Sequence, residues 1–183
     1  MRICVLGSEG QIGAHVTSWG DSEGFFVSRV DKLITTDHDL TQSSRNWTSA
    51  IADCDVVVFL AFDVGGANYL REFQNTHAFL HSNTIMMLNV FETVKQYNKK
   101  IIFASSVTAF DLDNSYGNCK LLGERLCASI GGISVRLWNI YGFETDPSRY
   151  HVVMDFISQA RTEGKISCKT TGQERRQLLY GED

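Results

Sequence analysis

The chain has 183 residues, 43% of them hydrophobic and 21% charged, which is enough apolar material for one ordinary domain core. Its formal net charge of −4 provides no basic surface, so we expect no nucleic-acid partner. No run approaches the roughly 18 apolar residues of a membrane span, and the N-terminus lacks a charged segment followed by a long apolar one, so we expect a cytoplasmic protein without a membrane partner.

Strand-like and helix-like segments alternate along the chain. Short apolar runs predict strands at 2–6, 25–30, 55–62, 101–105 and 133–138, and helical patterns predict helices at 11–19, 43–52, 75–97, 116–129 and 152–161. Gly20 is expected to end the first helix. Apolar rather than alternating runs indicate strands covered on both faces, and the helices between them indicate right-handed parallel crossovers. The predicted fold class is therefore α/β, a doubly wound parallel sheet or Rossmann fold.

The polar stretch 144–149 contains the single proline, Pro147, and is the best candidate for a domain boundary. We predict a nucleotide-binding domain at residues 1–145. Residues 146–183 are expected to form a small, incomplete substrate-binding segment.

Three glycines stand between the first strand and the first helix. Gly7 permits a tight turn, Gly10 lets a pyrophosphate approach the backbone, and Gly13 allows close helix packing. Asp31 follows at the end of the second strand, where a carboxylate can bind the ribose hydroxyls of a dinucleotide. Glycine triplets are often only turns, but the spacing to Asp31 strengthens the prediction of a dinucleotide site.

The charge of Asp31 favours NAD over NADP, because it would repel a 2′-phosphate. Arg29 and Lys32 flank it and could swing toward such a phosphate. The predicted cofactor is therefore NAD or NADP, with NAD slightly favoured.

Tyr116 and Lys120 stand four positions apart and share one face of a predicted helix. An ammonium beside a phenol favours the ionised form, and a phenolate is a usable proton acceptor. Such a pair is more often an amphipathic surface feature, so the prediction of chemistry depends on the glycine-rich opening.

Five cysteines are scattered without a Cys-x-x-Cys pair, and this odd number favours free thiols over disulfides or zinc. Cys4 is expected in the core. His77 and His81, four positions apart, could bind a metal in principle, but no third ligand is evident. We therefore expect surface histidines and no metal site.

These motifs, taken in order, resemble the extended short-chain dehydrogenase/reductases that modify nucleotide sugars, within the NAD-dependent epimerase/dehydratase family. The resemblance extends over most of the chain. Within the family, the sequence is most similar to the branch that contains GDP-mannose 3,5-epimerase and GDP-fucose synthase. The resemblance is carried by the glycines, Asp31, Leu60-Ala61 at the fourth strand, Asp63-Val64-Gly65-Gly66, Asn83, Ala104-Ser105-Ser106, Tyr116-x-x-x-Lys120 and the run from Arg136 to Gly142.

The resemblance implies a role for each matching residue. Ser106 would hydrogen-bond the reacting sugar oxygen, Tyr116 would exchange its proton, and Lys120 would lower the Tyr116 pKa and hold the nicotinamide ribose. The cofactor-binding residues implied are Gly7, Gly10, Gln11, Ile12, Gly13, Asp31, Leu60, Ala61, Tyr116 and Lys120.

Substrate contacts are implied for Ser106, Thr108, Asn139 and Arg176. Thr108 aligns with an acid/base cysteine of the GDP-mannose 3,5-epimerase branch, and a hydroxyl is a poor base at neutral pH, which counts against that double epimerisation. A loop asparagine and a surface arginine are otherwise usually just solvated.

Two departures from the family stand out. Only ten positions separate Ser106 from Tyr116, where relatives carry a longer loop lining the sugar pocket. The chain also stops soon after Arg176, in a stretch that relatives continue into the substrate domain.

Three interpretations therefore remain open. The first is a nucleotide-sugar epimerase or reductase, the second a dinucleotide-binding sensor or partner without turnover, and the third a reductase of a smaller carbonyl compound. Relatives also form a four-helix dimer contact, so a homodimer is expected. Its apolar surface would come from Phe79, Ile85, Met86, Leu88 and Phe91, although these side chains could equally cover the sheet.

Overall fold

A computed structural model describes residues 1–183 except 112, 143, 145–149, 169 and 174. Its centre is a five-stranded parallel sheet with strand order β2-β1-β3-β4-β5. The strands are β1 (Arg2–Leu6), β2 (Phe26–Val30), β3 (Val56–Phe59), β4 (Lys100–Ser106) and β5 (Ile133–Leu137). The predicted α/β, doubly wound fold class is confirmed. The strand order reverses at β1, so the carboxyl ends of β1 and β3 form the edge where such sheets bind ligands.

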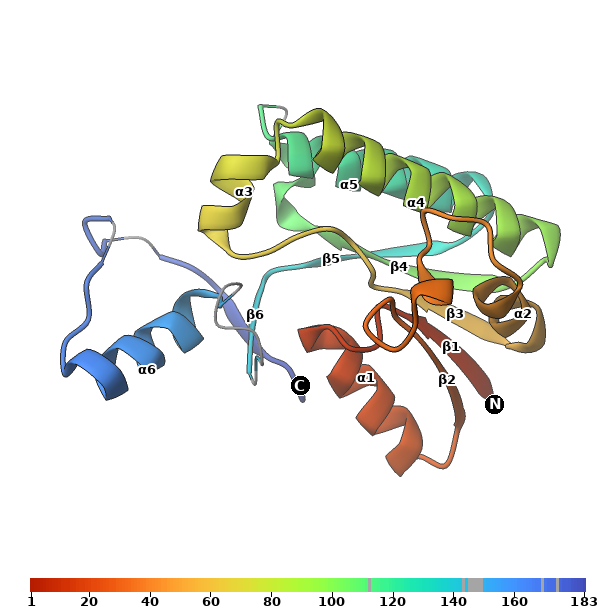
Figure 1. The fold of residues 1–183 in the computed structure, drawn as a ribbon, viewed down its shortest axis with the longest axis horizontal. Coiled ribbons are helices and arrows are strands. Elements are labelled where there is room, and N and C mark those ends of the chain that lie inside the picture. The colour runs from red at the N-terminus through yellow and green to blue at the C-terminus, as the bar shows by residue number, and fades with distance from the viewer. Residues whose placement is uncertain (112, 143, 145–149, 169, 174) are drawn as a thin grey trace.

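The helices lie on both sides of this sheet. One face carries α2 (Arg45–Asp53), α4 (His77–Gln96) and α5 (Ser115–Ser129), and the other carries α1 (Gln11–Ser22), as Figure 1 shows. The short helix α3 (Ala67–Phe73) and the 3-10 turns η1 (Thr36–His38) and η2 (Val107–Phe110) lie in the connections. Right-handed crossovers place α1 opposite the other helices, because β2 lies on the other side of β1 from β3.

The core fills the space between the sheet and α4. Phe59, Phe91 and Phe103 form an aromatic cluster with ring centroids 5.5–5.7 Å apart. Met87 is fully buried beside them, and Cys4 is fully buried in β1, as expected. All five cysteines are free, four of them buried and Cys168 exposed.

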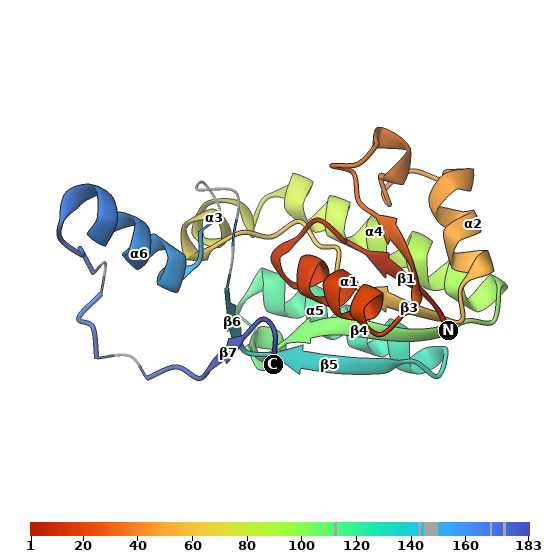
Figure 2. The same cartoon turned by 90° about the horizontal axis from the view of Figure 1, so that it is seen from below.

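The opposite face of the sheet is covered unevenly. The helix α1 packs against β1 and β2, and Figure 2 shows β5 at the outer edge beyond it. Ile133 is 63% exposed and Val135 41% exposed. The expectation that every strand is covered on both faces is therefore wrong for β5, because no described element packs over that part of the strand.

Several boundaries differ from the sequence-based expectations. The helix α1 continues through Gly20 to Ser22, because Gly20 packs against β2, where an added Cβ would lie 2.7 Å from the Val27 side chain. The strand β3 ends at Phe59, and α3 was not predicted.

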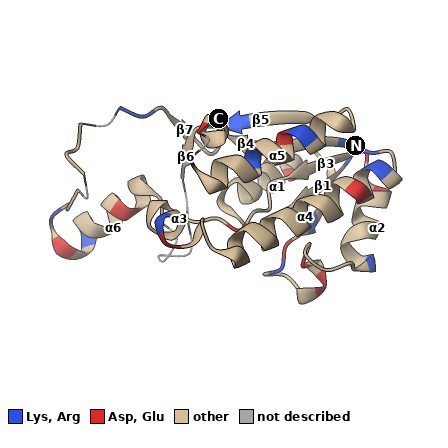
Figure 3. Ribbon diagram, turned by 90° about the horizontal axis from the view of Figure 1, so that it is seen from above, with Lys and Arg blue, Asp and Glu red and all other residues tan. Residues whose placement is uncertain are grey.

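Within the described residues no helix is both long and apolar enough to cross a membrane. Figure 3 shows acidic and basic residues interspersed along the helices.

The part of the chain after β5 forms a small parallel pair, β6 (Asn139–Tyr141) with β7 (Leu178–Tyr180), and the helix α6 (Val152–Glu163) lies between these strands in sequence. In Figures 1 and 2, α6 lies apart from the main sheet, and none of its residues is buried. The predicted boundary at 145/146 lies outside the described residues. The pairing of β7 with β6 returns the end of the chain to the strand that follows β5.

Candidate active site

The turn after β1 requires two of its glycines for steric reasons. Gly7 has φ of +89°, and an added Cβ would lie 2.6 Å from the amide nitrogen of Ala61. A Cβ on Gly13 would lie 2.0 Å from the carbonyl oxygen of Gly7. Gly7 thus brings the turn against the end of β3, and Gly13 brings α1 against the turn.

Gly10 is different, because the protein leaves room beside it. An added Cβ would meet only the Gly7 oxygen, at 3.4 Å, which is ordinary van der Waals contact. Gly10 is also the N-cap of α1 and offers no side chain to the free amides of the first turn. Among the described side chains, the amide nitrogen of Gln11 is buried without a hydrogen-bond partner. The space beside Gly10, the amides at the start of α1 and the side-chain amide of Gln11 together fit an anionic group such as a pyrophosphate.

Asp31 stands beside this turn, at the end of β2. Its carboxylate accepts hydrogen bonds from the amides of Glu9, at 3.1 Å, and Leu33, at 2.9 Å. Arg29 pairs with Asp21, and Lys32 is exposed. The carboxylate is therefore linked to the glycine-rich turn, whereas Arg29 has a carboxylate partner of its own.

Leu60 and Ala61 lie directly after β3, which is the third strand of this chain rather than a fourth. Their amides donate to the carbonyl of Leu6 at 2.9 and 2.8 Å, which holds them against the end of β1. Ile12 is half-buried in the first turn of α1. These residues and the glycines surround the carboxyl ends of β1 and β3.

The loop after β3 is fixed by Asn83 of α4, which is fully buried. Its side chain accepts from the Asp63 amide at 2.8 Å and donates to the carbonyls of Asp63 and Phe79. Tyr69 of α3 donates to the Asp63 carboxylate at 2.8 Å. The segment from 63 to 69 is thereby held close to the C-terminal edge of the sheet.

Ser106 ends β4 and caps η2. Its oxygen accepts hydrogen bonds from the amide of Thr108, at 3.2 Å, and from the hydroxyl of Thr108, at 2.9 Å. A Cβ on Gly117 would lie 2.1 Å from the Thr108 carbonyl oxygen, so this glycine lets α5 approach the turn. The sequence therefore brings Ser106 and Thr108 against the helix that carries Tyr116.

Tyr116 lies in the first turn of α5. Its amide donates to the side chain of Gln74 at 3.3 Å, and the Ser115 hydroxyl donates to Asn75 at 2.6 Å. Burial raises the pKa of the Tyr116 phenol, and its interaction with the Ser106 hydroxyl partly offsets this. The expected lowering of this pKa by Lys120 is not what the structure shows.

Lys120 is 4% exposed and donates to the carbonyl oxygen of Ala104 at 2.8 Å. Its ammonium lies 3.8 Å from the centre of the Phe62 ring and 5.7 Å from that of Tyr116. Burial lowers the pKa of Lys120 to about 7. The ammonium is therefore near the phenol, but Phe62 covers it.

Asn139 and Arg176 lie in the part of the chain that follows β5. The Asn139 side chain donates to the carbonyl of Gln177 at 3.2 Å, which links β6 to the residue before β7. Arg176 is exposed. These two residues therefore lie outside β4, η2 and α5, the elements that carry Ser106, Thr108, Tyr116 and Lys120.

Sequence reasoning missed Phe62 and Glu124. Phe62 adjoins the predicted Leu60-Ala61 pair, and no spacing rule marks its contact with Lys120. Glu124 stands four positions after Lys120, so the same helical periodicity that linked Tyr116 to Lys120 also identifies it.

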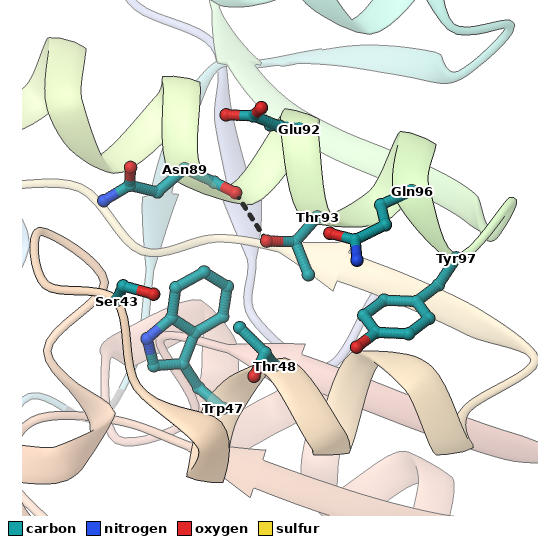
Figure 4. Close-up of a pocket in the computed structure, with 8 residues that line it drawn as sticks. All are labelled: Ser43, Trp47, Thr48, Asn89, Glu92, Thr93, Gln96 and Tyr97. Atoms are coloured by element: carbon teal, nitrogen blue, oxygen red, sulfur yellow. Dashed lines mark hydrogen bonds between the residues drawn. The ribbon is translucent and has the colours of Figure 1, made fainter.

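Two cavities lie apart from the catalytic candidates, although Ile12 of the predicted cofactor site lines the second one. One, of about 300 Å³, lies between α2 and α4 and is lined by the eight residues labelled in Figure 4. The other, of about 480 Å³, lies between α1 and the C-terminal residues 181–183. Neither is lined by the glycines of the turn or by Ser106, Tyr116 or Lys120.

His77 and His81 are exposed on α4, and their rings stack with centroids 5.5 Å apart. No group of three or more His, Cys, Asp or Glu side chains suited to a metal ion occurs in the part of the chain that the structure describes.

The model of the NAD dependent epimerase/dehydratase family matches residues 3–183, and the chain belongs to this family. The cofactor expectation of NAD or NADP agrees with that NAD-dependent family. Comparison with curated protein sequences finds no significant match.

Solved structures share the fold at low sequence identity. UDP-glucose 4-epimerase of Thermus thermophilus, in complex with NAD, is 20% identical with a TM-score of 0.76, and the match covers 100% of this chain and 71% of that one. A GDP-L-fucose synthetase of Naegleria fowleri bound to NADP is 19% identical with a TM-score of 0.75, over 99% of this chain and 69% of that one. UDP-N-acetylglucosamine 4-epimerase of Bacillus cereus is 21% identical with a TM-score of 0.74, over 100% and 68%.

Proposed function

We propose that this chain is an NAD(P)-dependent epimerase or reductase that acts on a nucleotide sugar. The observation that carries the proposal is the meeting of Ser106, Tyr116 and Lys120 at the end of β4, on the same edge of the sheet as the glycine-rich turn. The neighbours of similar fold include two nucleotide-sugar 4-epimerases, which supports this substrate class.

The residues around the turn would hold the cofactor. The amides at the start of α1 and the space at Gly10 would take the pyrophosphate, and Gln11 would supply a further donor. Asp31 would bind the adenosine ribose hydroxyls. When bound, the dinucleotide supplies a nicotinamide ring that accepts or donates a hydride.

Tyr116 would exchange a proton with the reacting sugar hydroxyl or keto oxygen, to which Ser106 donates a hydrogen bond. The Ser106 oxygen accepts from Thr108, so its single proton can be donated either to the Tyr116 oxygen or to a ligand oxygen beside it. Lys120 would hold the nicotinamide ribose and stabilise the phenolate by its charge once Phe62 has moved off its ammonium.

Asp31 supports a preference for NAD over NADP. The Arg29 guanidinium, the nearest arginine in sequence, pairs with Asp21. Because Asp31 also accepts two amide hydrogen bonds, its charge stays beside the adenosine end of the predicted cofactor site.

One observation favours a second function, a dinucleotide-binding partner or sensor without turnover. Phe62 covers the Lys120 ammonium and packs edge-on against the buried Tyr116 ring, so the lysine cannot reach a ribose and the phenol stays protonated until Phe62 moves. The short connection from Ser106 to Tyr116 suits the third interpretation, a smaller carbonyl substrate.

A homodimer through α4 and α5 also belongs to this proposal. Leu80 and Leu88 of α4 and Leu122 of α5 are 36%, 45% and 42% exposed. Phe79, Met86 and Phe91, by contrast, are buried against the chain itself, and Ile85 is half-buried. The contact would therefore be narrower than the sequence predicts.

Turnover assays with UDP-sugars and GDP-sugars, each with NADH and NADPH, test the proposal directly. Tyr116→Phe should lower kcat by about 100-fold or more while NADH still binds, because only the proton-transfer group is lost. Tyr97→Phe is the matched control, since Tyr97 is an exposed tyrosine at the end of α4. NADH binding without turnover of any sugar would favour the sensor, and unchanged turnover in Tyr116→Phe would reject the assigned role.

A further inference from the structure

Three residues spaced by four positions on α5 face the end of β4. Tyr116 interacts with the Ser106 hydroxyl, and Lys120 donates to the Ala104 carbonyl at 2.8 Å. One turn further on, Glu124 accepts a hydrogen bond from the Ser105 hydroxyl. Positions i, i+4 and i+8 share a helix face, so one row of side chains fastens α5 to three consecutive residues of β4.

The Glu124 carboxylate also forms an ion pair with Arg136 of β5. The Arg136 Nε donates to Glu124 Oε1 and its Nη2 to Oε2, both at 2.7 Å, which is the bidentate geometry of a strong pair. The Glu124 side chain is 14% exposed and that of Arg136 32%. Arg136 is the register partner of Ser105 across β4 and β5. The ion pair therefore joins α5, β4 and β5 at Ser105, next to Ser106.

Arg136 makes a second contact beyond this carboxylate. Its guanidinium carbon lies 3.8 Å from the centre of the Phe110 ring, a cation–π arrangement. Phe110 ends η2, the turn that Ser106 caps, and is itself 73% exposed. A large aromatic side chain this exposed gains little from burial, so the stacking on Arg136 contributes to the orientation of its ring.

We propose that Glu124 and Arg136 are positioning residues, which act through Ser105 and Phe110 to hold the Ser106 hydroxyl against Tyr116. The Glu124 carboxylate fixes the residue before Ser106, and the guanidinium fixes the far end of the turn after it. The connection from Ser106 to Tyr116 is short, so displacement of either end moves the serine relative to the phenol. This inference rests on the proposed function of Ser106 and Tyr116.

The electrostatics of the pair agree with this arrangement. The hydrogen bonds from Arg136 lower the pKa of Glu124, and the one from Ser105 adds to this effect. The carboxylate therefore stays ionised and bound to both partners at neutral pH. Because the Ser106 hydroxyl lowers the Tyr116 pKa, a displaced Ser106 should let that pKa rise further.

The test compares Glu124→Gln and Arg136→Lys with the native chain. Glu124→Gln keeps an acceptor for the Ser105 hydroxyl but loses the negative charge. In Arg136→Lys the ammonium cannot form the bidentate hydrogen bonds to Glu124 or stack on the Phe110 ring as a planar guanidinium does. We expect kcat to fall by about 10- to 100-fold, with the cofactor Kd changed by less than about twofold. The limb of the kcat–pH profile that reports Tyr116 should move to higher pH, the acidic limb where Tyr116 accepts the proton and the basic limb where it donates it. Asp55→Asn is the matched control, because Asp55 forms an exposed pair with Arg2 at the amino-terminal ends of β1 and β3.

Phe110→Leu provides a variant that keeps the buried pair. Since Phe110 is mostly exposed, this substitution should leave folding unchanged and lower kcat by several fold. Unchanged kcat in all three variants would overturn the proposal. An equal loss of cofactor binding, kcat and thermal stability would also overturn it, because it indicates a purely structural pair.

A second measurement separates this inference from the proposed function. The Tyr116 pKa can be followed by NMR in protein labelled with ¹³C at the tyrosine ζ carbon, with Tyr116→Phe used for assignment. We expect a higher Tyr116 pKa in Glu124→Gln and Arg136→Lys than in the native chain. If no nucleotide sugar turns over, the proposed function fails while this titration still tests the positioning. A Tyr116 pKa that does not move rejects the positioning role.

Discussion

The ammonium of Lys120 lies 3.8 Å from the centre of the Phe62 ring, and Lys120 is only 4% exposed. A lysine expected to meet a cofactor hydroxyl is thus bound instead to the Ala104 carbonyl and covered by an aromatic ring. Burial of a cation disfavours its charged form, which is why the pKa of Lys120 falls to about 7. This contact makes the protonation of Lys120 a property that can be measured.

The stability of the chain should rise with pH because of Lys120. Its folded pKa of about 7 lies below the unfolded value of 10.5, so between these two values the unfolded state binds more protons. Burial of the cation destabilises the fold fully below pH 7, and the penalty fades as pH rises. Urea unfolding should give a free energy about 2 kcal/mol higher at pH 8.5 than at pH 6.5 from this group.

Lys120→Met is the control for this effect, since methionine fills similar space without a charge. Its unfolding free energy should lack this rise between pH 6.5 and 8.5. An identical rise in the variant would mean that other groups cause it. Burial raises the pKa of Cys119 and Cys127, and the hydrogen bond with Cys4 lowers that of Cys54; because all these thiols are present in both proteins, the difference between the two profiles reports Lys120.

Removal of the Phe62 ring should raise the pKa of Lys120. Desolvation is the largest cause of the low value, and Phe62→Ala admits water to the ammonium. An NMR titration of protein labelled with ¹³C at the lysine ε carbon measures this pKa directly. Phe73→Ala is the control, because Phe73 lies on α3, is 38% exposed and packs on Tyr69. A Lys120 pKa that is the same in Phe62→Ala as in the native chain contradicts the shielding.

The glycines of the first turn should separate into structural and ligand-binding positions. Gly13→Ala should destabilise the fold by about 3 kcal/mol or more, because its Cβ would lie 2.0 Å from a backbone oxygen. Gly10→Ala should cost about 1 kcal/mol or less, since alanine is only a poorer N-cap. The same change should weaken NADH binding by about tenfold or more, because the methyl group would occupy the space left for the pyrophosphate.

Thermal unfolding and a fluorescence titration with NADH measure both quantities on the same preparations. Equal NADH affinity in Gly10→Ala and the native chain would place the pyrophosphate elsewhere. A Gly13→Ala protein as stable as the native one would show that α1 can move away from the turn.

The cofactor preference should depend on Asp31. Replacement of Asp31 by serine removes the charge that repels a 2′-phosphate, so the ratio of NADPH to NADH affinity should rise by about tenfold. Asp21→Ala should raise the ratio less, by releasing Arg29 from its partner. Isothermal titration with both cofactors gives the ratio. If neither change alters it, a residue outside β2 and its following turn selects the cofactor.

The sequence identified the elements whose patterns are local. The glycine-rich turn, Asp31 and the parallel sheet follow from short apolar runs and the spacing of glycines, and the structure contains the sheet and the close contacts of Gly7 and Gly13. The Tyr116–Lys120 spacing also predicted a helix correctly.

What the sequence could not provide is the direction of the Lys120 side chain. A shared helix face brings Lys120 near Tyr116, but the choice of the Ala104 carbonyl as partner depends on how α5 packs on β4. The contact with Phe62 depends on a loop from a different strand. Gly20 is a second example of a feature that depends on packing. Helix propensity predicts that α1 ends at this glycine, but Gly20 packs against Val27 and stays within the helix.

Oligomeric state should depend on the exposed leucines of α4 and α5. Figure 1 shows these two helices side by side on one face of the sheet, and Leu88 is 45% exposed in the middle of α4. Burial of such side chains between two copies is favourable, so light scattering should give twice the chain mass of 20.5 kDa. Leu88→Glu should give the mass of one chain, because a buried unpaired carboxylate is costly. Leu33→Glu, in the exposed turn after β2, should leave the dimer intact. A dimer that survives Leu88→Glu but dissociates in Ile133→Glu would place the contact on the open face of β5 instead.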